Sequence, residues 1–524
     1  MDNQDRKFLD ACTEESVFEL FKETHCAHPL DTDIIGKLSK LKTAIRLDDD
    51  DYMLFRCQSE IDELWGLLLQ KAIICLRYYD EREPFKGNEQ KTPKAYGLDE
   101  LRKYYSKYKD FERVLYGASQ YYRDHVIHVF RTWLCGIELL VRNNGSNLEK
   151  VGIMDTIARK GTEKQAIVIS PAEKISMWTL IALTHDLGYP LEKARNVIGV
   201  TQDMVSTFVR NPDISADFSF HGAQNYMNDF VVRLMSSKME FREAPKTASE
   251  DDEGRELKPY VARLQPKYYF KFQKSLERND HGILSTLIIY KLLTYFLESD
   301  YNINEDYRFS EEDCRQFYIR REILRAIASH TCNDVYQMYM GSFSFLLRVC
   351  DDAQEWGRKN ISELYVKSAQ EYTLGDIDLR FNKDSVSECT ISEEIIVPDS
   401  DSVHTLLKRF HAQAIIYVTI FRDGQDTNSR DFSFHKKLEI KAEGIEITVE
   451  LHIKQDSASK IDGRIKYSSN GTVNKKYGKG FFEALPLSKD GTWKPYAKEG
   501  NEEPLKPSEN ANWRFGSFGL NLSD

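Results

Sequence analysis

Histidines and aspartates in helical, apolar surroundings are the residues of this chain best suited to chemistry. They follow one another along the sequence as His128, the adjacent pair His185 and Asp186, His281, His330 and Asp351. Imidazole and carboxylate groups together bind divalent transition metals such as Mn, Fe, Co, Ni or Zn. Carboxylates also bind Mg²⁺, so Mg is a further candidate for the ion. Six such groups are enough for one or two ions. The sequence therefore predicts a metal centre assembled from distant segments.

The adjacent His and Asp are expected at a helix end, where they can chelate one ion or where Asp186 can bridge two. We expect His128 and Asp351 to complete the ligand shell of the first ion. His281 and His330 would then serve the second ion. Two ions about 3.5–4 Å apart activate a water and hold phosphoryl oxygens. This arrangement predicts hydrolysis of a phosphoester.

Two arginines near these residues are candidates for holding phosphate. Arg131 follows His128 by one helical turn, and Arg358 follows Asp351 by two turns. A guanidinium binds phosphoryl oxygens in a bidentate manner, so we expect both arginines to act in catalysis together with Asp186. The alternative for Arg131 is an ion pair with a nearby carboxylate.

Further side chains are candidates for supporting roles around the metal ligands. His125 shares a helix face with His128 at i, i+3 spacing, and we favour His128 as the ligand. His125 then has either a supporting role or a packing role. Lys193, Arg195 and Arg348 are the other candidates, and solvated positions are the alternative for Lys193 and Arg195.

The order H…HD…H…H…D resembles that of the HD-domain metal-dependent phosphohydrolases over roughly residues 115–360. The spacing of His128 and Arg131 fits the first histidine of that family. The segment RVCDDAQEWGR at 348–358 is similar to one in bacterial multidomain HD proteins. The resemblance implies an all-helical metal-binding domain and a hydrolase of the nucleotidase or phosphodiesterase type. Its substrate would be a nucleotide or a related phosphoester.

The chain departs from the family pattern just after the HD pair. Many HD hydrolases have a lysine there that contacts a phosphate, whereas residues 187–190 read LGYP. Lys193 and Arg195 are the nearest cationic substitutes. The missing lysine keeps a second hypothesis open, a regulatory module that senses a nucleotide with weak or no turnover. A nuclease acting on single strands is a third.

Changes in hydrophobic period divide the chain into three predicted parts. Residues 1–110 have helical periodicity and are expected to form an N-terminal helical extension. Residues 111–365 also have helical periodicity and are expected to form the metal-binding domain. A charged insertion at about 238–267 is expected to act as a lid or a partner-binding arm. Residues 366–524 are expected to form a separate α+β domain, rich in strands. The fold class is therefore mainly α.

Several local patterns indicate where elements begin and end. Ser170 followed by Pro171 predicts the start of the helix before His185, and Gly188 its end. Alternating apolar residues at 438–453 predict two strands joined at Glu443-Gly444. Further short strands are expected at 417–421 and 464–467, with a helix at about 403–415.

Composition limits the partners and the compartment. The net charge of −11 disfavours nucleic acid as the main partner, although it does not exclude it. The nine scattered cysteines, without a CxxC pair, predict reduced thiols and a cytoplasmic protein. No apolar signal segment or run of about 18 apolar residues is evident, so no membrane contact is expected. P-loop, dinucleotide-binding, GxSxG and HExxH motifs are absent from the sequence. The sequence is compatible with a protein partner that binds the C-terminal domain and with a homo-oligomer.

Overall fold

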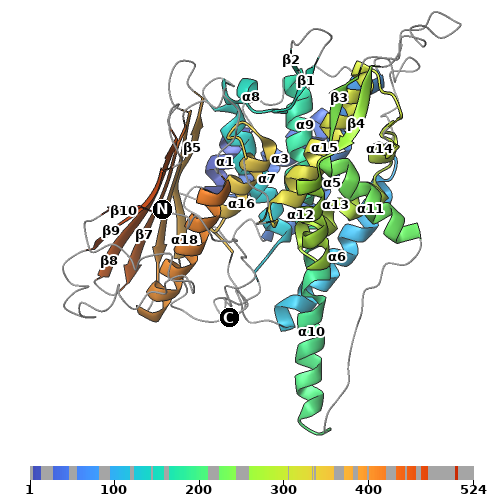
Figure 1. Cartoon of the computed structure of the whole chain (residues 1–524). Helices are drawn as coiled ribbons and strands as arrows, with labels where there is room; N and C mark the ends of the chain where they lie inside the picture. The colour runs from blue at the N-terminus through green and yellow to red at the C-terminus, as the bar shows by residue number, and fades with distance from the viewer. Residues whose placement is uncertain are drawn as a thin grey trace, which may run out of the picture.

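The structure is a computed structural model, and helices make up most of its described part (Figure 1). A single large sheet lies in the C-terminal third, so the chain is mainly α with a β-rich C-terminal region, as predicted. The described residues are 4–12, 28–46, 56–81, 95–118, 123–142, 146–158, 164–209, 223–242, 259–304, 306–332, 334, 338–358, 371–381, 387–397, 400–420, 432–442, 445–455, 462–469 and 502–504.

Within the described residues, four helices precede the central region, and three of them contact it directly. They are α1 (Gln4–Cys12), α3 (His28–Ala44), α5 (Gln58–Glu81) and α6 (Leu98–Ala118). Helix α5 buries leucines at helical spacing, including Leu64, Leu68 and Leu76, and contacts α9. Helix α1 contacts α7, and α6 contacts α10 and α13. The N-terminal helices are therefore part of the wall around the central helices.

The central region consists of ten described helices and two small pairs of strands. The helices are α7 (Val126–Val141), α8 (Ser146–Lys150), α9 (Pro171–Thr184), α10 (Tyr189–Ser206), α11 (Ala223–Ser236), α12 (Pro266–Glu277), α13 (His281–Leu292), α14 (Thr294–Leu297), α15 (Glu311–Ser329) and α16 (Phe343–Ala353). The antiparallel strand pairs are β1 (Thr156–Ala158) with β2 (Lys164–Ala166), and β3 (Ser237–Phe241) with β4 (Tyr260–Leu264). The ends of the predicted charged insertion thus form β3 and β4, while residues 243–258 lie outside the described part.

Polar side chains fix the starts of the helices that carry the predicted ligands. The Asp124 carboxylate accepts the backbone N–H groups of Ile127 and His128 at the start of α7. Ser170 and Ser310 form capping boxes at the starts of α9 and α15. Ser342 is the N-cap of α16, and its hydroxyl accepts the backbone N–H of Phe345. These caps fix where each helix begins along the chain and hence where its ligand falls.

Helix α9 ends earlier than the sequence predicts. Its last residue is Thr184, and a short turn then leads to α10, which starts at Tyr189. The predicted stop at Gly188 is therefore wrong by four residues. The backbone N–H of Gly188 donates to the Ser285 hydroxyl at 2.8 Å, which fixes the turn against α13.

The C-terminal sheet has six described strands in the order β10-β9-β8-β7-β6-β5. The strands are β5 (Glu371–Arg380), β6 (Ser387–Ile396), β7 (Phe432–Ala442), β8 (Ile445–Gln455), β9 (Asp462–Ser469) and β10 (Glu502–Pro504). Only the β6–β7 pair is parallel among these strands, and α18 (Ser400–Ile420) connects its two members. The predicted strands around 438–453 and 464–467 are confirmed.

The prediction of a strand at 417–421 is wrong, because α18 continues to Ile420. Its apolar residues face the sheet, where Tyr417 stacks on Phe434 with ring centroids 4.4 Å apart. A helical packing contact therefore accounts for the apolar run that the sequence pattern assigned to a strand.

The sheet and the helical region share buried surface. Phe345 of α16 lies edge-on to Phe434 of β7, with ring centroids 6.4 Å apart. The Arg142 guanidinium donates to the Ile377 carbonyl at 2.6 Å. The Asn147 amide donates to the Leu379 carbonyl at 2.5 Å. The proposed boundary at residue 365 thus separates two types of structure that pack on each other.

Candidate metal centre

The six predicted ligands lie at or near the ends of five helices that meet in the central region (Figure 1). Two of them are C-caps, His185 at the end of α9 and His330 at the end of α15. His281 is the first residue of α13, and His128 is the third residue of α7. Asp351 belongs to the last turn of α16. Helix ends therefore bring side chains from five separate segments to one place.

One group of ligand atoms includes His128, His185 and Asp351, all within 4.8 Å of one another. His128 Nε2 lies 2.8 Å from Asp351 Oδ1, and His185 Nε2 lies 3.7 Å from the same oxygen. Ligand atoms that share an ion about 2.1 Å away lie about 3.0–3.4 Å from one another. The observed distances scatter around this range, so this group is able to hold one ion.

A second group includes His185, Asp186 and His330, and His281 approaches it. His281 Nε2 and His330 Nε2 lie 3.3 and 3.5 Å from Asp186 Oδ1. The other oxygen, Oδ2, lies 3.4 Å from His185 Nε2 and 3.6 Å from His128 Nε2. Asp186 therefore presents one carboxylate oxygen to each pair of histidines.

The second ring nitrogen of each ligand histidine has its own acceptor. Nδ1 of His185 lies 2.8 Å from the Ala182 carbonyl, and Nδ1 of His330 lies 2.5 Å from the Ile327 carbonyl. Both contacts run to the residue three positions earlier in the same helix. An N–H at Nδ1 that donates to a fixed oxygen leaves Nε2 as the metal-binding nitrogen.

Two supporting residues that the sequence pattern does not indicate serve the other histidines. Glu192 Oε2 lies 2.6 Å from Nδ1 of His281, and Gln354 Oε1 accepts from Nδ1 of His128. Glu192 occupies the first turn of α10, and Gln354 follows Asp351 by three residues. Gln354 could have been found from its position about one helical turn after Asp351, whereas no comparable spacing indicates Glu192.

Two buried nitrogens support the fit of a metal to this centre. Nε2 of His185 and Nε2 of His330 make no hydrogen bond within the described residues, although both imidazoles are buried. A buried polar atom without a partner costs free energy, which a coordinated ion would remove. Both atoms lie near the Asp186 carboxylate, so these residues fit a metal ion.

The protonation of the centre reflects burial and mutual attraction. Burial alone would raise the pKa values of Asp186 and Asp351, but the adjacent histidines hold both well below the usual range. Burial lowers the pKa values of His128 and His330. Burial would also lower the pKa of His281, but the carboxylates of Glu192 and Asp186 raise it to about 10. The carboxylates are therefore ionised and ready to bind a cation.

Arg131 does not point to the metal ligands, contrary to the sequence prediction. Its guanidinium forms two hydrogen bonds to Asp5 of α1, at 2.9 and 2.7 Å, and a third to the Trp356 carbonyl at 3.0 Å. Arg131 and Asp5 are both buried. The side chain is long enough to cross from α7 to α1, and the buried carboxylate attracts it. We therefore assign Arg131 to packing between α1 and α7.

Arg358 makes a hydrogen bond at the start of α7. Its Nε donates to the Asp124 carbonyl at 3.1 Å. Burial and the nearby Arg123 lower its pKa, and the carboxylates of Asp186 and Asp351 oppose that shift. Its charge also contributes to lowering the pKa of His128. The charge of Arg358 thus influences Asp186, Asp351 and His128 electrostatically.

The remaining supporting candidates have different surroundings. Arg348 donates to the His330 carbonyl and pairs with Asp352 at 3.2 Å, so it positions a ligand. Lys193 pairs with Glu192 at 2.9 Å. The ring of His125 stacks on Tyr189, with centroids 3.7 Å apart, beside the ligand helices. The side chain of Arg195 lies outside the described part.

Two glycines permit the close approach of the helix ends. A Cβ atom at Gly188 would lie 2.3 Å from the His281 carbonyl oxygen. At Gly282 it would lie 2.7 Å from the Ile327 carbonyl oxygen and 3.0 Å from Nδ1 of His330. Any larger residue at either position would separate α13 from α9 or α15. The short distances to Asp186 depend on these two positions.

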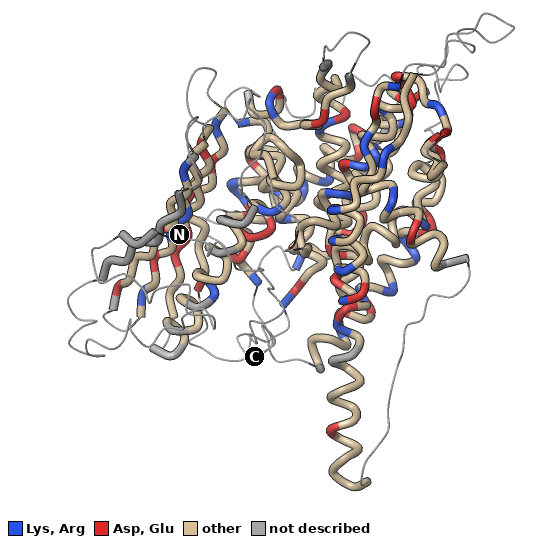
Figure 2. Tube along the Cα trace, viewed as in Figure 1, with Lys and Arg blue, Asp and Glu red and all other residues tan. Residues whose placement is uncertain are grey.

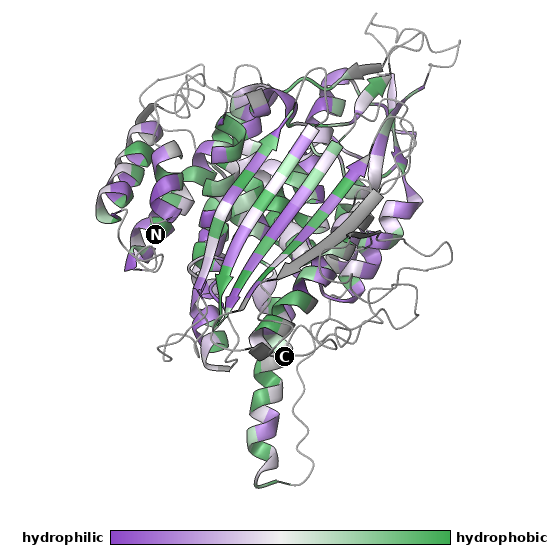
Figure 3. Ribbon diagram, turned by 90° about the vertical axis from the view of Figure 1, so that its left-hand side faces the viewer, coloured by the Kyte–Doolittle hydropathy of each residue, from purple (hydrophilic) through white to green (hydrophobic). Residues whose placement is uncertain are grey.

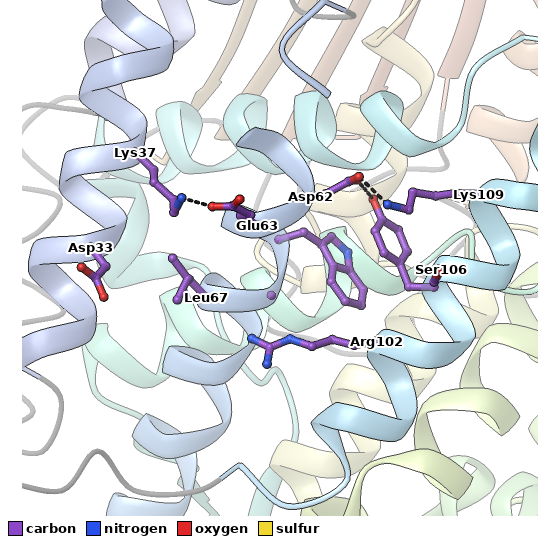
Figure 4. A pocket seen from close by; sticks show the side chains of 11 residues that line it. Asp33, Lys37, Asp62, Glu63, Leu67, Arg102, Ser106 and Lys109 are labelled. Atoms are coloured by element: carbon purple, nitrogen blue, oxygen red, sulfur yellow. Dashed lines mark hydrogen bonds and ion pairs between the residues drawn. The ribbon is translucent and has the colours of Figure 1, made fainter. Parts of the chain in front are cut away.

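A separate hollow of about 560 Å³ lies among α3, α5 and α6 (Figure 4). Its charged side chains form ion pairs, Lys37 with Glu63 and Lys109 with Asp62. Trp65 in its wall donates from Nε1 to the Leu183 carbonyl at 2.9 Å, two residues before His185. The hollow contains none of the six predicted ligands, and its wall supports the end of α9.

Comparison with protein-family models, with curated proteins and with solved structures gave no match for this chain.

Proposed function

We propose that this protein is a metal-dependent phosphohydrolase of the HD-domain type, acting on a nucleotide or related phosphoester in the cytoplasm. The observation that carries the proposal is the position of Asp186, which has two histidines near each of its oxygens. The histidines around Asp186 would hold one or two divalent ions, of Mn, Fe or another transition metal, and such ions would supply an activated water and neutralise phosphoryl charge. The order of the ligands along the chain supports the HD assignment.

The residues of the chain supply orientation and charge. Asp186 holds both halves of the centre at a fixed spacing, since it is buried and follows the last turn of α9. Arg358 provides a guanidinium for the phosphoryl oxygens. Glu192 and Gln354 fix the rings of His281 and His128. Asp186, Glu192 and Gln354 would thus keep the ligands in place, and Arg358 would help to hold a phosphoester beside the bound metal.

The charge distribution supports a small substrate over a nucleic acid. In the view of Figure 2, Lys and Arg positions are mixed with Asp and Glu positions along the described helices. A protein that binds nucleic acid nonspecifically needs a row of cations along its surface. Among the described residues, no helix is both long and apolar enough to cross a membrane.

The second candidate function is a nucleotide-sensing module with little or no turnover. The cation nearest to the position of the missing family lysine, Lys193, is paired with Glu192. This pair favours a role for Lys193 in fixing His281 through Glu192 rather than in contacting a phosphate. Nucleotide binding without hydrolysis would fit such a site.

A panel assay separates these functions. The metal-free chain would be loaded with Mn²⁺, Fe²⁺, Co²⁺ or Zn²⁺ and assayed with nucleoside mono-, di- and triphosphates, cyclic dinucleotides, single-stranded DNA and bis(p-nitrophenyl) phosphate. We expect metal-dependent hydrolysis of a nucleotide, lost in Asp186→Ala. Binding of a nucleotide without hydrolysis would support the sensing module. Hydrolysis of single strands alone would identify a nuclease, and retained activity in Asp186→Ala would contradict the metal mechanism.

A further inference from the structure

The C-terminal sheet contains a second set of metal-binding side chains, far along the sequence from the helical centre. His435 of β7 lies directly opposite His452 of β8 in the antiparallel register. Glu450, two residues before His452, lies on the same face of β8 because side chains alternate along a strand. Two neighbouring strands thus hold two imidazoles and a carboxylate in a fixed register.

These three side chains are on the face of the sheet turned away from the helices. Along β7, buried residues such as Phe434 alternate with half-buried ones such as His435. Phe434 packs on α18, so His435 points to the opposite side. Figure 3 looks onto this side, and no described helix lies in front of the central strands there. An ion has access to the three side chains, which are half-buried.

The geometry brings three donor atoms together. One donor atom from each of His435, His452 and Glu450 lies within 4.8 Å of the other two. The imidazole rings stack, with centroids 4.2 Å apart and planes 13° apart. His435 Nε2 lies 3.5 Å from Glu450 Oε1, but this buried nitrogen makes no hydrogen bond to a described residue. A coordinated ion would satisfy it.

Neighbouring charges leave Glu450 available to the histidines. Lys437 lies opposite Glu450 in the register, but its amino group pairs with Glu439 at 2.6 Å. Lys441 on the same face pairs with Glu394, also at 2.6 Å. Burial and the proximity of His452 lower the pKa of His435, with Glu450 acting in the opposite direction. A neutral imidazole is the form that binds metal.

We propose that His435, His452 and Glu450 form a second metal site, which bridges β7 and β8 on the outer face of the sheet. Two histidines and a glutamate are a donor set of zinc sites that keep a coordination position open. Imidazole donors favour Zn²⁺, Co²⁺, Ni²⁺ or Cu²⁺ over Mg²⁺. The ion would connect two strands at their middle and leave a position for water or another ligand. This site does not depend on the proposed hydrolase function.

Co²⁺ titration of the full-length, metal-free chain tests the proposal, with bound Co²⁺ counted by elemental analysis and visible absorption. The double variant His435→Gln/His452→Gln should bind one ion fewer per chain than the wild type. His185→Ala, which alters the helical centre, should keep the sheet ion. Ser433→Ala is the matched control, because Ser433 lies on the same face of β7 and offers no imidazole or carboxylate. It should bind Co²⁺ as the wild type does.

Glu450→Gln provides a milder variant in case the double substitution disturbs the sheet. It keeps the shape of the side chain but removes its charge, and we expect Co²⁺ affinity at this site to fall about tenfold or more. Equal ion counts in the wild type and a folded double variant would overturn the proposal. Unchanged affinity in Glu450→Gln, or loss of the same ion in Ser433→Ala, would overturn it as well. In that case the two histidines form an ordinary stacked cross-strand pair.

Discussion

At the scale of single residues, the two arginines proposed from the sequence have different surroundings. Arg131 forms a buried bidentate ion pair with Asp5, whereas Arg358 donates to the Asp124 carbonyl and interacts electrostatically with Asp186 and Asp351. Helical spacing cannot separate them, because a long side chain reaches in several directions from the same Cα position. The partner of Arg131 comes from α1, more than 100 residues earlier in the chain.

These surroundings predict opposite effects of alanine substitution. Arg131→Ala leaves Asp5 buried without its partner and should lower the free energy of unfolding by about 3–5 kcal/mol. Arg358→Ala should keep the fold and lower turnover of the substrate found in the panel assay by roughly 10²-fold, with metal content unchanged. Denaturant unfolding and steady-state kinetics measure the two effects. A stable, inactive Arg131→Ala would restore the catalytic role expected from the sequence.

The raised pKa of His281 predicts proton release when metal binds. In the metal-free protein its pKa is about 10, above the ordinary value of 6.5. At pH 8 the ring is therefore protonated, and binding of an ion through Nε2 must displace about one proton. Calorimetric titration with Mn²⁺ in buffers of different ionisation enthalpy measures this number. Glu192→Gln removes one of the charges that raise the pKa, so it should reduce proton release at this pH.

The same shift sets how the stability of the metal-free protein depends on pH. Because the pKa of His281 is higher in the folded than in the unfolded chain, its stabilising contribution is complete below about pH 6.5. That contribution is lost as the pH rises towards 10. Urea unfolding of wild type and His281→Ala at pH 6 and 9.5 tests the sign of this effect. The wild type should exceed the variant in free energy of unfolding by more at pH 6 than at pH 9.5, and an equal difference at both pH values would contradict the prediction.

At the scale of elements, the centre depends on how closely α13 approaches its neighbours. Gly282 faces the last turn of α15, where a Cβ atom would meet the Ile327 carbonyl and the His330 ring. The backbone there cannot yield without moving a ligand. Capping residues fix where each helix starts, and the glycine fixes how near two helix ends lie.

Gly282→Ala should therefore lower both metal affinity and melting temperature. Gly199→Ala in α10 is the matched control, because a Cβ atom there would meet no atom within 4 Å. Alanine has the higher helix propensity, so the control should be more stable by about 0.5–1 kcal/mol. Thermal melts and Mn²⁺ titrations measure both effects. Wild-type affinity in Gly282→Ala would show that the helices can separate without cost to the centre.

At the scale of the whole molecule, the sheet covers part of the helical region. Contacts such as Phe345 with Phe434 and Arg142 with the Ile377 carbonyl cross the proposed boundary. Arg409 of α18 also pairs with Glu355, which Arg123 contacts from the other side. All six ligands of the helical centre lie before residue 365, but some of the contacts that support the surrounding helices come from residues after it.

A chain truncated after residue 365 should thus retain metal-binding residues but lose stability. We expect its melting temperature to fall by roughly 10 °C or more, since several buried contacts would be exposed to water. Differential scanning calorimetry and metal analysis of residues 1–365 test this expectation. A truncated chain as stable as the full-length protein would show that the helical region is an independent domain.

The sequence by itself determined the mainly helical class, the C-terminal strands and the residues able to bind a metal. Helical and strand periods are local properties, and the His and Asp residues that bind metals are chemically distinctive. The tertiary structure alone decided which oxygen of Asp186 faces which histidines, and that Glu192 and Gln354 orient two of the rings. It also directed Arg131 to Asp5 and placed His435 opposite His452. The physical reason is that side-chain partners come from segments distant in sequence, and their pairing depends on helix packing and strand register, which no local pattern records.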